Sequence, residues 1–328
     1  MVNTRGALAC AAALVAGALP AGPARAQPQG FAVERLDQSA PGSGWWTLND
    51  LAWPLGVGGA ISLSLGYAHD PLRIRPEGGG PGLSLIEHQL FTSIGLAVSH
   101  HRFRLHASLS SPIYLAGQSG LVGDQQLTSP SVNLEQNPDT ITDVHLALDA
   151  RLLGDPASPL RLGASAELVF PSGDRADFSS DDTYRAAGRV LLAGEQGRFT
   201  YAGHLGLHVR PLNDPQVVQG PRGSELLFGA GAAIKVPFAQ GSLQVGPEVF
   251  GATALRSWFG DNTSALEGLL SASLERSGLA AGRMRLKVGL GAGLHPRFGA
   301  PVWRAVVGLE LIGQLVEPDA NPSPAGRR

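Results

Sequence analysis

The chain has 328 residues, of which 43% are hydrophobic, 16% charged and 6% aromatic, and it contains 44 glycines and 24 prolines. This hydrophobic fraction excludes an intrinsically disordered chain. The few aromatic residues and only two methionines argue against a thick helical or α/β core. A formal net charge of −2 gives no electrostatic reason to expect nucleic-acid binding.

The first 26 residues have the pattern of a secretory signal peptide. Arg5 supplies a positive start, residues 7–19 are apolar, and residues 24–26 form an A-x-A cleavage site. The single cysteine, Cys10, lies in this segment, so we expect an exported chain with no disulfide and no thiolate metal site. We also expect no transmembrane helix, because no run of 18 apolar residues follows.

Most of the remaining sequence alternates between apolar and polar residues, which is the period of a β-strand. Twelve such runs occur, at 58–69, 88–99, 101–113, 142–153, 159–170, 184–194, 198–210, 224–236, 242–254, 265–275, 283–294 and 302–312. Most are longer than the ~5–6 residues of a typical globular strand and reach the ~9–11 residues that cross a bilayer. The pattern predicts an all-β fold, a closed antiparallel transmembrane β-barrel of twelve strands.

The predicted connections alternate between short and long. The short ones, such as 154–158 and 195–197, resemble periplasmic turns, and the long polar ones, such as 114–141 and 171–183, resemble external loops. We therefore expect a barrel over 58–312, followed by a Pro-rich tail at 313–328. The sequence leaves three alternatives open for residues 27–57. They plug the lumen, they lie in the periplasm, or they add two strands and give a barrel of fourteen strands.

The two faces of the predicted strands differ in a way that indicates a membrane. One row, as in Leu286, Val288 and Leu290, is apolar and uncharged on strand after strand, which a lipid-facing surface requires. The other row is largely Gly, Ala and Ser with some charges, as expected of a confined lumen. Aromatic residues near the strand ends predict two interfacial girdles, formed by Tyr67, Phe170 and Tyr184 on one side and by Phe103, Phe199 and Tyr201 on the other.

The inward rows carry twelve cations and seven anions. One interpretation, which we favour, is that these charges pair across strands and fill a narrow interior. The other is a solvated wall that prefers anions. The candidate lumen-lining residues are Arg102, Arg104, Arg185, Arg189, His204, His208, Glu225, Glu248, Arg283, Arg285, Lys287 and Arg304.

Signatures of enzymes, cofactors and metal sites are weak. The glycine clusters at 229–231 and 289–293 lie inside strands, so we interpret them as positions where the lumen face must be small. His204 and His208 lie about 13 Å apart on one strand face, too far to bind one ion. We therefore predict no catalytic site, no cofactor and no metal. We interpret the acidic loop 172–182 as solvated. Its carboxylates could bind divalent cations that bridge to anionic lipopolysaccharide.

These features predict an outer-membrane protein of a Gram-negative bacterium, functioning as a narrow passive porin-like channel with weak anion preference. The alternatives are a structural or surface-adhesive barrel with a closed lumen, and a secreted β-sandwich binding module. The expected partners are outer-membrane lipids, lipopolysaccharide, the barrel-assembly machinery and small solutes, but not nucleic acid.

Several short motifs together resemble a known family. They are Phe31–Asp37, Gly44–Trp46, Ile86–Phe91, Phe170–Asp174, Gly223–Leu226, Gly246–Glu248 and Phe298–Pro301. In order and spacing this set is similar to the N-terminal β-barrel region of the OmpA-like outer-membrane proteins of myxobacteria. The resemblance implies an outer-membrane barrel. It does not imply cell-wall anchoring, because sixteen residues after Ile312 cannot form the peptidoglycan-binding domain that often follows.

Overall fold

The computed structural model describes residues 30–74, 82–122, 125–133, 135–136, 140–211, 223–260, 263–279, 282–295 and 299–316. The predicted signal peptide and residues 317–328 of the predicted tail lie outside these ranges. No helix in the described part of the chain is long and apolar enough to cross a membrane.

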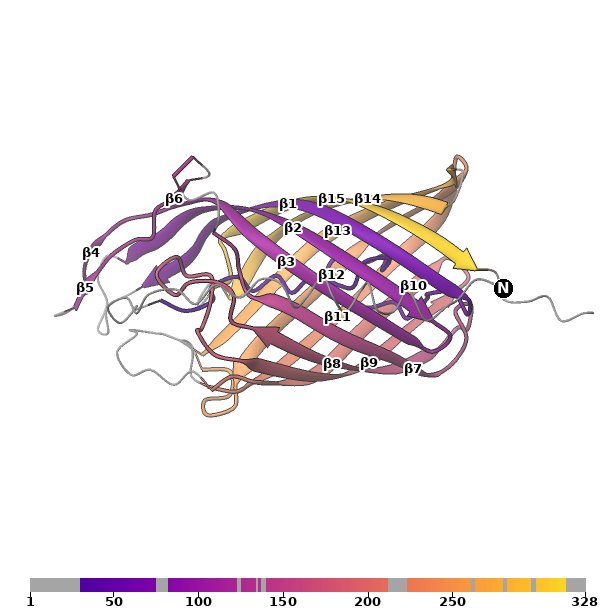
Figure 1. Cartoon of the computed structure of the whole chain (residues 1–328), viewed down its shortest axis with the longest axis horizontal. Coiled ribbons are helices and arrows are strands. Elements are labelled where there is room, and N and C mark those ends of the chain that lie inside the picture. The colour runs from indigo at the N-terminus through magenta and orange to yellow at the C-terminus, as the bar shows by residue number, and fades with distance from the viewer. Residues whose placement is uncertain are drawn as a thin grey trace, which may run out of the picture.

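Fifteen strands are described, and twelve of them close into a barrel (Figure 1). The barrel strands are β1 (Val57–Ile74), β2 (Leu83–His100), β3 (Phe103–Ala116), β7 (Val144–Leu153), β8 (Arg161–Phe170), β9 (Arg185–Gln196), β10 (Phe199–Val209), β11 (Glu225–Phe238), β12 (Gly241–Ala254), β13 (Ser264–Leu279), β14 (Gly282–His295) and β15 (Trp303–Val316). All neighbours are antiparallel, and β1 pairs with both β2 and β15, so the sheet has no open edge. The predicted fold class and the count of twelve strands are confirmed.

The connections divide the barrel into two ends. Short turns at 101–102, 154–160, 197–198 and 239–240 define a turn side, and the longer connections define a loop side. On the loop side, β6 (Val132–Asn133) pairs with β3, and β4 (Gly120–Val122) pairs with β5 (Gln125–Leu127). The alternation of short and long connections in the sequence corresponds to this division.

The outer surface of the barrel is apolar and exposed, as a wall that faces lipid requires. On β10, Leu205, Leu207 and Val209 are each more than half exposed, whereas the intervening Gly206 is buried. Phe103 and Phe199 are exposed at the turn side, and Tyr184 is exposed at the loop side, where the aromatic girdles were predicted. The inward face is therefore the one that carries the charged residues.

Residues 30–56 pass through the lumen as an irregular chain, which we call the luminal segment (Figure 1). At the loop side, the Val33 amide donates a hydrogen bond to the Phe178 carbonyl at 3.1 Å. At the turn side, the Trp53 indole donates to the His101 carbonyl, also at 3.1 Å. This part of the chain lies inside the barrel, and residues 30–56 contain no strand.

Candidate functional site in the barrel lumen

Two consecutive tryptophans of the luminal segment pack against two different arcs of the barrel wall. Trp45 packs in a buried cluster with wall residues of β9, β10 and β11, such as Leu191. Trp46 packs in a second cluster with wall residues of β2, β12, β13 and β15, such as Leu269. Both tryptophans are at most 1% exposed. The segment is therefore held in the bore by apolar contacts with both arcs.

Glycines of the wall make this close approach possible. A Cβ atom added at Gly289 would lie 2.9 Å from Trp46 Nε1, and one added at Gly308 would lie 2.9 Å from another atom of the same indole. A Cβ at Gly231 would lie 2.9 Å from Trp45. At Gly231 and Gly289, this geometry agrees with the interpretation that the glycine clusters keep the lumen face small, and the luminal segment occupies the space.

Two charged wall residues hold the backbone of the segment at the tryptophans. Glu248 accepts hydrogen bonds from the amides of Trp46 and Thr47, both at 2.9 Å, and from the Thr47 hydroxyl at 3.0 Å. Lys287 donates to the Trp45 carbonyl at 2.9 Å, and its ammonium lies 4.9 Å from the centre of the Trp46 ring. Both residues were predicted to line the lumen, and here they bind the chain that crosses it.

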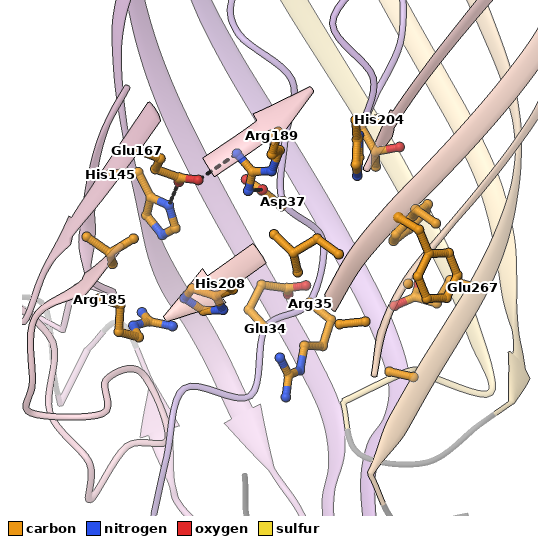
Figure 2. A pocket seen from close by; sticks show the side chains of 18 residues that line it. Glu34, Arg35, Asp37, His145, Glu167, Arg185, Arg189, His204, His208 and Glu267 are labelled. Carbon is orange, nitrogen blue, oxygen red and sulfur yellow. Dashed lines mark hydrogen bonds and ion pairs between the residues drawn. The ribbon is translucent and has the colours of Figure 1, made fainter. Parts of the chain in front are cut away.

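Above the tryptophans, toward the loop side, lies a polar cavity of about 110 Å³ (Figure 2). The charged and imidazole groups that line it are Glu34, Arg35, Asp37, His145, Glu167, Arg185, Arg189, His204, His208 and Glu267. They come from the luminal segment and from β7, β8, β9, β10 and β13. We call this space the polar chamber. Its mixture of carboxylates, guanidinium groups and imidazoles suits small polar solutes or ions.

Ion pairs attach the luminal segment to the wall of the chamber. Arg35 pairs with Glu225 at 3.1 Å, and Glu34 pairs with Arg304 at 2.9 Å. Asp37 pairs with Arg189. Glu34, Arg35 and Asp37 were missed as site residues, because nothing in the sequence indicated which strand ends they would meet.

Most of the predicted lumen-lining residues are buried and paired inside the barrel. Arg104 pairs with Asp149 at 2.7 Å, and Arg185 pairs with Asp143 at 2.5 Å. The remaining pairs are Arg189 with Glu167, His208 with Glu225, Arg285 and Lys287 with Glu310, and Arg304 with Glu267. Among the described residues, these charges pair across strands, which is the interpretation we favoured from the sequence. These cations do not form an open, solvated wall.

Two of the predicted lumen-lining residues are exposed at the turn-side end of the barrel. Arg102 lies in the turn after β2, exposed, and donates to the Leu152 carbonyl at 3.1 Å. Arg283 is 43% exposed near the turn-side end of β14, where it pairs with Glu275 at 3.0 Å. Both residues were assigned to the lumen only from the alternation of apolar and polar residues. That alternation continues beyond the end of the barrel interior.

The loop between β8 and β9 is a second departure from expectation, because part of it is buried. Asp181 is 2% exposed and accepts hydrogen bonds from Arg210 and from the Ala32 amide. Burial alone would raise the pKa of Asp181, but the charge and hydrogen bonds of Arg210 outweigh it and lower this pKa to about 2. The interpretation of the loop as uniformly solvated is therefore wrong at Asp181.

Comparisons with known proteins place the fold. No protein-family model and no curated protein matches the chain. The chain is similar to the COG4313 outer membrane channel from Pseudomonas putida F1, with a TM-score of 0.53 and 14% identity, over 84% of this chain and 99% of that one. A Pseudomonas aeruginosa FadL homologue has a TM-score of 0.40 and 10% identity, over 88% of this chain and 100% of that one. The first likeness identifies the fold as that of an outer-membrane β-barrel.

Proposed function

We propose that this chain is an outer-membrane channel for small polar solutes that its own luminal segment holds closed. The observation that carries the proposal is the position of Trp45 and Trp46, which pack against two arcs of the wall beneath a polar chamber. The segment is held by hydrogen bonds and ion pairs, and the only cysteine of the chain is Cys10, so no intrachain disulfide fixes it. Contacts of this kind can break and re-form, as a gate requires.

The proposed selectivity is a weak preference for anions that develops when the segment is displaced. Cations outnumber anions on the inward rows of the strands. The segment contributes three carboxylates, Glu34, Asp37 and Asp50, against one guanidinium, Arg35, and so offsets part of this excess while it is in place. The resemblance to the barrel region of myxobacterial OmpA-like proteins supports the location in the outer membrane, and we propose no enzymatic activity.

A second candidate function is a structural barrel with a permanently closed lumen. Its support is the dense packing of the segment, in which Trp45, Leu48 and Leu51 are completely buried. The two candidates differ in one property, namely whether breaking the contacts of the segment allows ions to pass.

Planar-bilayer conductance of the wild type and of Glu248→Ala separates them. The substitution removes the carboxylate that accepts three hydrogen bonds from Trp46 and Thr47, so we expect a several-fold rise in conductance and a reversal potential that indicates anion preference. Glu195→Ala is the matched control, because Glu195 is 38% exposed and pairs only at the surface, with Lys235. Absence of conductance in both wild type and a correctly folded Glu248→Ala would overturn the channel proposal.

A further inference from the structure

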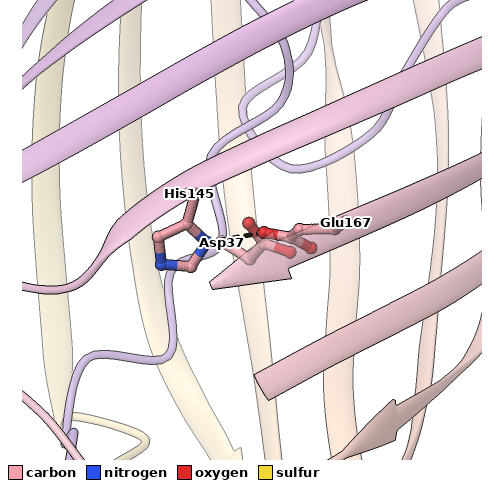
Figure 3. A group of neighbouring side chains, drawn as sticks. All are labelled: Asp37, His145 and Glu167. Atoms are coloured by element: carbon pink, nitrogen blue, oxygen red, sulfur yellow. Dashed lines mark hydrogen bonds and ion pairs between the residues drawn. The ribbon is translucent and has the colours of Figure 1, made fainter. Parts of the chain in front are cut away.

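Three side chains of types that can bind a metal ion meet in the polar chamber (Figure 3). They are Asp37 of the luminal segment, His145 of β7 and Glu167 of β8, and one ligand atom from each lies within 4.8 Å of the other two. His145 Nδ1 lies 2.5 Å from Glu167 Oε1. One member of the group thus belongs to the segment and two belong to the wall.

An imidazole with two carboxylates is a ligand set that first-row divalent ions accept in proteins. Ligand atoms that lie about 2.0–2.2 Å from a tetrahedral zinc ion are roughly 3.3–3.5 Å apart. The group must therefore rearrange around an ion: the His145 Nδ1–Glu167 Oε1 contact of 2.5 Å must open, and separations that reach up to 4.8 Å must close. Asp37 can make that movement, because its side chain is 51% exposed, whereas that of Glu167 is 6% exposed. Positions left open on the ion would face the chamber, where water can occupy them.

Arg189 explains how the two carboxylates are kept together without an ion. It pairs with Asp37, and it pairs with Glu167 Oε2 at 2.7 Å, while Glu167 Oε1 is the atom that faces His145. The guanidinium therefore supplies the positive charge between the carboxylates. An ion bound on the His145 side would compete with Arg189 for this role, so Arg189 should limit the affinity.

We propose that Asp37, His145 and Glu167 form a binding site for a divalent first-row transition ion such as Zn²⁺. Because Asp37 lies on the luminal segment, the bound ion joins the segment to two adjacent wall strands. The binding itself follows from the geometry alone, whereas its consequence, a channel held closed more firmly, rests on the proposed function.

Binding is tested on the purified full chain in detergent, with Zn²⁺ measured by calorimetry and Co²⁺ by its visible absorption. We expect one ion per chain in the wild type, and at least tenfold weaker binding in His145→Ala and Asp37→Asn. His204→Ala is the matched control, because His204 lines the same chamber outside the three-residue group, and it should bind as the wild type does. Arg189→Met should bind more tightly, since it removes the competing charge.

Heat-modifiable mobility on a gel establishes that each variant is folded. A folded wild type that binds no Zn²⁺ or Co²⁺ would overturn the site, and so would equal affinities of His145→Ala and His204→Ala.

A separate measurement tests the join between segment and wall. We expect Zn²⁺ to lower the conductance of Glu248→Ala but not that of the Glu248→Ala, His145→Ala double variant. Zn²⁺ binding in the first variant without any change in its conductance would overturn the join. Absence of conductance in every variant would instead count against the channel function, and the calorimetric result would still decide whether the ion site exists.

Discussion

The two halves of the lumen are occupied by the same segment in different ways. In the middle and toward the turn side, Trp45, Trp46 and Leu51 are buried against glycines, alanines and leucines of the wall. Toward the loop side, the segment meets the wall through ion pairs that surround a polar chamber. Small wall residues let the two indoles lie against the wall, whereas the long charged side chains of the loop-side half line the polar chamber and leave space between segment and wall. In the proposed function, closure therefore belongs to the turn-side half and ligand chemistry to the loop-side half.

The strongest way to break this contrast is to fill the space that the turn-side packing needs. Gly289→Val places methyl groups where Trp46, Val306 and Leu269 already lie within about 3 Å of a Cβ, so Trp46 cannot stay in place. We expect a several-fold increase in bilayer conductance. Gly188→Val is the matched control, because nothing lies within 4 Å of a Cβ added there. Equal conductance of the two variants would mean that the tryptophan layer is not what closes the bore.

In the loop-side half, the largest expected effect follows from removing a buried cation. Arg304→Met leaves Glu34 and Glu267 without the guanidinium that pairs with both, and breaking a buried pair costs about 3–5 kcal/mol. Urea unfolding in detergent should report this loss. Arg283→Met, which removes an Arg that is 43% exposed, should change stability by less than about 1 kcal/mol. A similar loss in both variants would remove the distinction between buried and exposed pairs.

The pH dependence of the loop-side half is set partly by Asp181. Its pKa is lowered to about 2 in the folded protein, below the ordinary value of about 3.9. The stabilisation is therefore fully present above about pH 4 and is lost as the pH falls toward about 2, with a size of roughly 2 kcal/mol. Asp181→Asn should abolish this part of the pH profile. An unchanged acid limb in that variant would show that Asp181 does not dock the loop onto Ala32 and Arg210.

The smallest predicted effect concerns Trp53, at the turn-side end of the segment. The Arg104 and Arg151 guanidinium groups lie 4.6 and 5.0 Å from its ring, and its indole donates to the His101 carbonyl. Trp53→Phe keeps a ring but loses the hydrogen bond, so we expect a loss of about 1 kcal/mol in unfolding free energy. Trp258→Phe, at a residue that is 60% exposed, should be neutral. A neutral Trp53→Phe would mean that the ring contacts alone anchor this end.

The barrel was predictable from sequence because the residue pattern that specifies each strand is local. Strict alternation over ten or more residues fixes a strand, its two faces and its length, and twelve repetitions fix the architecture. The contacts of the luminal segment are not local. Arg35 meets Glu225 at a separation of 190 residues, and the Trp46 amide meets Glu248 at a separation of 202. No periodic pattern encodes such a pairing, so the position of the segment stayed open.

Two of these contacts join short motifs that, in the sequence, indicated only the family resemblance. The motifs that carry the family resemblance include Phe31–Asp37, Gly44–Trp46, Gly223–Leu226 and Gly246–Glu248. In the structure, Arg35 of the first motif binds Glu225 of the third, and Trp46 of the second binds Glu248 of the fourth. Short motifs far apart in the chain were therefore contact partners. For Arg185 and Arg189, by contrast, the sequence predicted that each would pair with a carboxylate. It did not predict which one, because the adjacent strands carry several carboxylates.

We infer that the luminal segment closes the bore, and a reversible covalent lock between segment and wall can test this claim. A Cβ at Gly95 would lie 2.8 Å from Pro41 Cγ, so Pro41→Cys with Gly95→Cys places two thiols near the geometry of a disulfide between segment and wall. In the Glu248→Ala background, we predict low conductance when this pair is oxidised and high conductance after reduction, with each single cysteine insensitive to redox state. High conductance with the disulfide formed would contradict the claim.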